Sequence, residues 1–189
     1  SNASGALKLL GESYPFAPGG RYALAYDNHN SVNGIREFAR ARGARVTYLP
    51  VAAPELRLDT AALRAELLAA DPHACNLLAY PAQSNFSGVQ HPLEWVLEAQ
   101  ELGWDVLLDC AAFAPTNELR LDVVKPDFVP LSFYKLFGYP TGVGALIARH
   151  AALAKLRRPW FAGGTITLAS VQGAGWHYLI PGAAGLEDG

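Results

Sequence analysis

Short apolar segments of strand length alternate along this chain with longer segments of helical periodicity. Because consecutive parallel strands need a crossover connection, usually a helix, the alternation predicts a three-layer α/β sandwich with a mostly parallel central sheet. The expected strands are residues 21–26, 45–49, 74–80, 105–108, 128–132 and 143–148, and the expected helices are residues 4–10, 32–42, 60–70, 92–102 and 151–157. From residue 160 onward the sequence favours loops.

The last two expected strands depart from the parallel pattern. Only a short glycine-rich segment separates residues 128–132 from residues 143–148. A parallel return needs about a dozen or more residues. The second strand should therefore run antiparallel to the first, which makes the sheet mixed.

The composition is that of a globular chain with a large core. Of the 189 residues, 51% are apolar and 17% are charged, which fits one domain. The net charge of −2 gives no electrostatic basis for binding nucleic acid or an anionic membrane. A membrane-spanning helix needs a run of about 18 apolar residues, and the sequence has no run of that length. Cys75 and Cys110 lack metal-ligand spacing, which predicts reduced core thiols in a cytoplasmic protein and no metal site.

The two ends of the chain are abrupt. Residues 1–3 have the composition of a remnant of a cleaved expression tag, and we expect them to lie outside the fold. Residues 4–189 are then one domain, expected to be a piece of a longer protein.

Three polar clusters fall at the carboxyl ends of expected strands. They are Asp27–Ser31, Gln83–Gly88 and Asp109–Ala112. In open α/β sheets, ligands bind outside the carboxyl ends of the strands. The sequence therefore predicts a ligand site where these clusters converge.

Lys135 lies in an aromatic segment, Phe133–Phe137, that is followed by a glycine-rich turn. Burial disfavours the charged form of an amine, so the pKa of Lys135 should fall and the amine should become nucleophilic, which suits Schiff-base chemistry. A lysine whose side chain extends to water from an aromatic surface is the alternative. Ser132, three residues earlier, and the turn favour the first interpretation because together they could hold a phosphate beside the amine.

The segment Ser132-Phe-Tyr-Lys-Leu-Phe-Gly-Tyr-Pro-Thr-Gly142 resembles the lysine segment of class V aminotransferases and cysteine desulfurases. It looks most like the N-terminal domain of molybdenum cofactor sulfurases. The resemblance implies the large domain of the fold type I pyridoxal-phosphate enzymes, with Lys135 holding pyridoxal 5′-phosphate and moving protons.

The same resemblance assigns the ring contacts of the cofactor. Asp109 would keep the pyridine nitrogen protonated, and the small Ala111 would let the ring lie flat. His29 would stack on the ring and relay protons. Asn85 would contact the ring hydroxyl oxygen. From the residues alone, Asp109 could be a helix cap or turn residue, His29 a solvated loop residue and Asn85 a turn residue.

The resemblance also implies a phosphate site. Ser4 and Gly5 open the first helix, whose N-terminus would bind the phosphate. Ser132 would add a hydroxyl, and Tyr134 stands where desulfurases usually have histidine. Thr165 would reach the phosphate of a partner subunit, which implies a homodimer.

One departure from the desulfurase pattern concerns the ring. Asp109-Cys-Ala-Ala112 lacks the glutamine that usually follows the acid, although molybdenum cofactor sulfurases share a similar segment. The sulfur-carrying cysteine and the arginine that binds the substrate carboxylate are expected outside residues 4–189, because neither Cys75 nor Cys110 is suitably placed.

The expected function is that of the cofactor core of a sulfurtransferase acting on L-cysteine. A class V aminotransferase or lyase with another amino-acid substrate, and a catalytically incomplete module, are the alternatives. A nucleotide-binding domain is disfavoured because the chain lacks a Gly-x-Gly-x-x-Gly or Walker-type loop.

Overall fold

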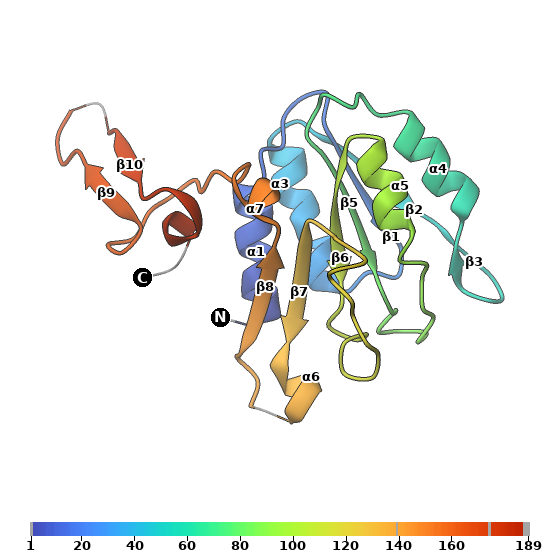
Figure 1. Ribbon diagram of the computed structural model, residues 1–189. Helices are drawn as coiled ribbons and strands as arrows, with labels where there is room; N and C mark the ends of the chain where they lie inside the picture. The colour runs from blue at the N-terminus through green and yellow to red at the C-terminus, as the bar shows by residue number, and fades with distance from the viewer. Residues whose placement is uncertain (1, 139, 174, 187–189) are drawn as a thin grey trace.

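The computed structural model describes residues 2–138, 140–173 and 175–186. At its centre is a six-stranded sheet with the order β2-β1-β5-β6-β7-β8 (Figure 1). The strands are β1 (Arg21–Ala25), β2 (Arg45–Leu49), β5 (Asn76–Pro81), β6 (Trp104–Asp109), β7 (Phe128–Ser132) and β8 (Gly144–Ala148). The first five are parallel and β8 runs antiparallel to β7, so the predicted mixed sheet is confirmed.

Helices cover both faces of the sheet, which makes three layers (Figure 1). On one face lie α1 (Ala3–Ser13), α3 (Ile35–Ala41) and α7 (His150–Leu153), and on the other lie α4 (Thr60–Leu68) and α5 (Trp95–Glu101). Strands β5 and β6 are buried along their whole length, because they lie in the middle of the sheet under both helical layers. No described helix is both long enough and apolar enough to cross a bilayer.

Several expected elements have different bounds in the structure. The helix expected over residues 32–42 is two helices, α2 (Asn30–Asn33) and α3, which meet at Gly34. A short hairpin of β3 (Val51–Ala52) and β4 (Arg57–Leu58) was not predicted. The region expected to be loops contains a hairpin of β9 (Ile166–Ala169) and β10 (His177–Leu179) and the 3₁₀ helix η1 (Gly182–Leu186).

The lysine segment is also helical. Residues expected to form a turn are the one-and-a-half-turn helix α6 (Phe133–Phe137), which ends at Gly138 with φ of 65°. Figure 1 shows α6 at the carboxyl end of β7, beside the start of β8. The helix therefore places Lys135 at the edge of the sheet where the parallel strands end.

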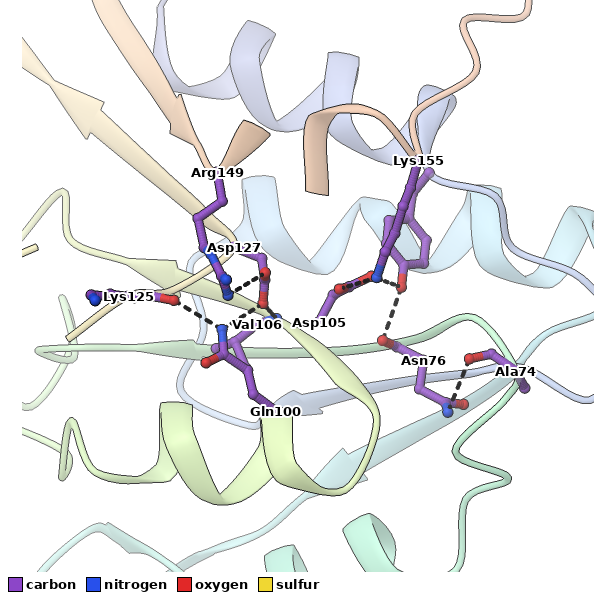
Figure 2. Close-up of polar contacts among 10 residues, drawn as sticks. Ala74, Asn76, Gln100, Asp105, Val106, Lys125, Asp127, Arg149 and Lys155 are labelled. Atoms are coloured by element: carbon purple, nitrogen blue, oxygen red, sulfur yellow. Dashed lines mark hydrogen bonds and ion pairs between the residues drawn. The ribbon is translucent and has the colours of Figure 1, made fainter. Parts of the chain in front are cut away.

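The opposite edge of the sheet has a buried polar network (Figure 2). Asp105 accepts a hydrogen bond from Tyr14 at 2.8 Å and pairs with Lys155 at 2.6 Å. Asp127 accepts hydrogen bonds from Gln100 and from the Val106 N–H, both at 2.9 Å. These contacts tie the amino-terminal edge of the sheet to α1, to α5 and to the segment after α7.

Candidate active site

A cavity of about 320 Å³ lies at the carboxyl edge of the parallel strands. Its walls come from the start of α1, from the loops after β1, β5 and β6, and from the segment after β7. The residues that line it are Asn2, Ala3, Ser4, Leu7, His29, Ser31, Pro81, Gln83, Asn85, Asp109, Ala111, Ala112, Ser132, Tyr134, Lys135, Thr141 and Gly142. All three predicted polar clusters therefore contribute to one site.

Asp109 is the buried acid of this cavity, with 7% of its surface exposed. Its Oδ1 accepts a hydrogen bond from the Ala111 N–H at 2.9 Å, which stabilises the turn after β6. Within the described residues, Oδ2 has no hydrogen-bond donor. Burial raises the pKa of the Asp109 carboxyl, while the Ala111 N–H and the charges of Lys135 and His29 act to lower that pKa.

Lys135 faces the same cavity as Asp109 but is less buried than the sequence predicts. Its side chain is half-buried, and the neighbouring Tyr134 is 42% exposed. The amine lies 6.0 Å from the centre of the Tyr134 ring. Lys135 is therefore only partly buried, because a helix turns successive side chains in different directions.

The loop that carries His29 is fixed on both sides. Asn28 donates hydrogen bonds to the carbonyls of Ala25 and Ala79, at the ends of β1 and β5. The His29 ring accepts a hydrogen bond from the Ser31 N–H through Nδ1 at 3.1 Å. A backbone N–H can only donate, so the proton of the neutral ring must be on Nε2.

Asp27, two residues before His29, forms a second anchor. Its Oδ2 lies 2.9 Å from Nε2 of His91, and both side chains are at least 94% buried, since 6% and 1% of their surfaces are exposed. His91 follows the loop that carries Asn85. The pair therefore joins the loops after β1 and β5, which supply two walls of the cavity.

Asn85 lies exposed in a tight turn after β5. The buried Ser84 hydroxyl accepts hydrogen bonds from the N–H groups of Phe86 and Ser87, and Gly88 closes the turn with φ of 75°. Asn85 thus forms the turn and also lines the cavity, so the turn position is compatible with the predicted contact to a ligand.

The start of α1 and the end of β7 supply hydroxyl groups. Ser4 and Ser31 lie 2.6 Å apart through their hydroxyl oxygens. Ser132 is buried but its hydroxyl makes no hydrogen bond to the described residues. Gly144 lets α1 approach this closely, because a Cβ there would lie 2.5 Å from the Ala3 nitrogen.

Two predicted site residues do not line the cavity. The N–H of Gly5 is already used, since it donates to Oδ1 of Asn2, the N-cap of α1. Thr165 is fully buried in the loop before β9, where its hydroxyl donates to the Ala162 carbonyl. Residues 2 and 3 take part in the fold, because Asn2 caps α1 and Ala3 begins it.

The cysteines lie away from the cavity lining. Cys110 is buried, and burial raises the pKa of its thiol above the ordinary range. Cys75 is half-buried and directly precedes β5, rather than lying within the strand expected over residues 74–80. No cluster of three or more metal-ligating side chains occurs among the described residues.

A family model provides the comparison that identifies this fold. The model described as aminotransferase class-V matches residues 1–180. The chain belongs to the aminotransferase class-V family. Within this family, molybdenum cofactor sulfurase 3 from Aedes aegypti is 42% identical over 179 positions, covering 89% of this chain and 22% of that protein. Molybdenum cofactor sulfurase from Homo sapiens is 38% identical over 207 positions, covering 100% of this chain and 23% of that protein.

This class V domain therefore spans less than a quarter of the length of those relatives. Solved cysteine desulfurases share its fold. The enzyme CsdA from Escherichia coli superposes with a TM-score of 0.82 at 23% identity, covering 100% of this chain and 46% of that one. The desulfurase from Thermococcus onnurineus gives 0.82 at 24% identity over the same shares. The expected three-layer fold is confirmed.

Several lining residues had no role assigned from the class V resemblance. Ser31 and Gln83 belong to the polar clusters, and Thr141 and Gly142 belong to the motif that follows the lysine. Their position at strand ends was the available signal. Asn2 was missed because it was set aside with the residues at the start of the chain.

Proposed function

We propose that this chain is the pyridoxal-phosphate-binding core of a sulfurtransferase of the molybdenum cofactor sulfurase and cysteine desulfurase type, acting on L-cysteine. The observation that carries the proposal is the placement of Asp109 and Lys135 in one cavity. In pyridoxal phosphate the pyridine nitrogen and the aldehyde lie at opposite positions of one ring. The acid would contact the nitrogen, and the amine would react with the aldehyde.

The donor set fits the cofactor. Oδ2 of Asp109 accepts no hydrogen bond from the described residues, which leaves it for a protonated pyridine nitrogen. The hydroxyls of Ser4, Ser31 and Ser132 line the same cavity and suit a phosphate group. The small side chains of Ala111 and Ala112 leave room for a flat ring between these groups.

Bound pyridoxal phosphate would supply an electron sink for negative charge on the α-carbon of the substrate. Lys135 would hold the cofactor and, once released by the substrate amine, move protons as general base and acid. Asp109 would keep the pyridine nitrogen protonated. His29 would cover the ring, with its Nε2–H as the proton-carrying atom.

The name of the substrate comes from the relatives. Proteins named molybdenum cofactor sulfurase and cysteine desulfurase are similar to this chain in sequence and in fold, respectively. We extend L-cysteine to this chain as the substrate. A cytoplasmic homodimer, in which Thr165 approaches the phosphate site of the partner, is part of the same proposal. The sulfur-accepting cysteine would belong to the rest of the protein.

Binding is tested by titrating pyridoxal phosphate into the chain and recording the visible absorbance of the imine. The unsubstituted chain and Lys8→Ala, which alters an exposed lysine on α1, should both show saturable absorbance. Lys135→Ala should show none. Equal absorbance from Lys135→Ala and the unsubstituted chain would contradict the proposal.

The substrate is tested on the full-length protein. With L-cysteine and a thiol reductant, alanine and sulfide should appear in equal amounts, because the carbon–sulfur bond is broken and the sulfur is released by reduction. Turnover of another amino acid without sulfide would instead indicate a class V aminotransferase or lyase.

A further inference from the structure

Gln83 brings an amide side chain to the cavity from the end of β5. The adjacent Ala82 N–H donates to the carbonyl of Asp109, so this segment runs beside the acid. Gln83 itself pairs with Gln90 in an isolated bridge that closes the loop. It lines the cavity together with Asn85 and Asp109. Its position is therefore fixed by backbone contacts on both sides.

The orientation of the Gln83 amide is fixed by a chain of hydrogen bonds. Asn117 donates from Nδ2 to the Phe113 carbonyl at 3.1 Å. A carbonyl can only accept, so the nitrogen end of Asn117 is determined. The same Nδ2 lies 3.0 Å from the Thr116 hydroxyl and 3.2 Å from Gln83, and its two hydrogens are shared among these acceptors, so Gln83 presents its oxygen, Oε1, to a nitrogen that can only donate. Gln90 donates to this oxygen as well, at 3.2 Å.

The nitrogen of Gln83 is left as an unused donor. Oε1 accepts two hydrogen bonds on the side of Asn117 and Gln90, and Nε2 donates to none of the described residues. An amide nitrogen carries two donors that need acceptors from a ligand or from water. Positions 111 and 112 of the neighbouring wall are both alanine and offer no side-chain donor, so Gln83 and Asn85 supply the amide groups on this side of the cavity.

We propose that Gln83 donates a hydrogen bond from Nε2 to the ring oxygen of pyridoxal phosphate, an inference that rests on the proposed function. In this cofactor, the pyridine nitrogen and the aldehyde carbon lie at opposite ring positions, and the ring oxygen and the phosphate arm lie on opposite sides of that axis. Asp109 and Lys135 define the axis. The serine hydroxyls suit the phosphate side, so the ring oxygen faces the wall of Gln83 and Asn85.

This contact gives Gln83 a specific chemical role. The ring oxygen is anionic in its conjugated form, and a donor stabilises that form. Asn117 and Gln90 act through Gln83 and are positioning residues, because they hold its oxygen so that its nitrogen is presented to the cavity.

The test measures dissociation constants for two probes by absorbance titration. One is pyridoxal phosphate, and the other is its 3-deoxy analogue, which lacks the ring oxygen. Gln83→Leu should weaken binding of pyridoxal phosphate roughly three- to tenfold, the effect of one net hydrogen bond, and leave binding of the analogue unchanged. It should also raise the pH midpoint of the absorbance of the bound cofactor, because the anionic oxygen loses its donor.

Gln83→Glu is the second variant, with nearly the same shape. The glutamate can still accept hydrogen bonds from Asn117 and Gln90, but it presents an oxygen to the cavity. It should therefore weaken the binding of pyridoxal phosphate more than Gln83→Leu does. Gln172→Glu, an exposed change on the connection between β9 and β10, is the matched control and should have no effect. Thermal unfolding of each variant checks that the fold is kept.

The outcomes separate the two claims. Saturable, Lys135-dependent binding of pyridoxal phosphate with equal losses for both probes, or with no loss, would overturn the role of Gln83 alone. Absence of such binding by the unsubstituted chain would overturn the proposed function and the role of Gln83 together.

Discussion

Asp109 at the end of β6 and Lys135 in α6 line one cavity, and the charge of Lys135 acts to lower the pKa of the Asp109 carboxyl. The two residues are not close in sequence and come from the ends of neighbouring strands. Burial has the larger and opposite effect, so the pKa of Asp109 is raised overall. Burial therefore disfavours the ionised form of Asp109, and a cationic ring nitrogen bound beside it would stabilise that form.

Asp109→Asn should stabilise the chain without cofactor and weaken cofactor binding. The raised pKa means that the folded state binds a proton on Asp109 more tightly than the unfolded state does. The contribution of Asp109 to the unfolding free energy is thus largest below its unfolded pKa, about 3.9, and declines as pH rises through the folded pKa. Urea denaturation at several pH values should find the variant more stable at pH 7, with no such gain at pH 3.

The same variant should bind pyridoxal phosphate at least about tenfold more weakly, because a hydrogen bond to a charged group is lost. Unchanged affinity, or lower stability at pH 7, would contradict the assignment of Asp109.

His91→Phe should destabilise the chain by about 1–3 kcal/mol, because a buried carboxylate loses its partner. Oδ1 of Asp27 already has no hydrogen bond in the described structure, and His91 contacts the other oxygen. The aromatic replacement keeps the stacking on Trp95. Cofactor affinity should fall as well, since the loops of His29 and Asn85 are released from each other. Urea denaturation and cofactor titration measure both effects.

His91→Gln is the control for that change. It retains a donor for Asp27 and should recover part of the stability and affinity. Full stability of His91→Phe would show that the pair does not hold the loops.

Ser132→Ala should distinguish the phosphate end of the cavity from the ring end. The Ser132 hydroxyl makes no hydrogen bond to the described residues. Loss of this donor to a phosphate should weaken the binding of pyridoxal phosphate by roughly tenfold. Pyridoxal, which lacks the phosphate, should bind both proteins equally well. Affinities for the two compounds are compared by absorbance titration; an equal loss for both would place Ser132 elsewhere on the cofactor.

Lys155→Met should lower stability by about 1 kcal/mol without changing cofactor affinity. Its amine pairs with the buried Asp105 at the edge of the sheet away from the cavity (Figure 2). Lys8→Met removes an exposed lysine of similar shape and should change neither property. The midpoint of urea denaturation and the cofactor titration are the measurements. A loss of affinity in Lys155→Met would show that the two edges of the sheet are coupled.

The sheet was predictable because each strand and each crossover helix has a local pattern. The strands over residues 45–49 and 128–132 have the predicted bounds. Helix α6 was not predicted, since five residues are too few for periodicity to be recognised. The hairpin of β9 and β10 was missed because its strands, of four and three residues, are too short for an alternating pattern to be recognised.

Long-range contacts within the site could not be predicted from the sequence. The bond between Asp27 and His91 joins residues 64 positions apart, and neither residue has a local signal for the pairing. The orientation of Gln83 likewise depends on Asn117, 34 positions away. Gly5 was assigned to the phosphate because the start of α1 was expected one residue too late; in the structure the Gly5 N–H donates to the side chain of Asn2.

The lysine that binds pyridoxal phosphate is identified by trapping the imine. The chain is incubated with pyridoxal phosphate, reduced with sodium borohydride, digested, and mapped by mass spectrometry. The four lysines are Lys8, Lys125, Lys135 and Lys155. At limiting cofactor, we expect a pyridoxyl group on Lys135 and no such group at this position in Lys135→Ala. Label spread evenly over the four lysines, or absent from Lys135, would contradict it.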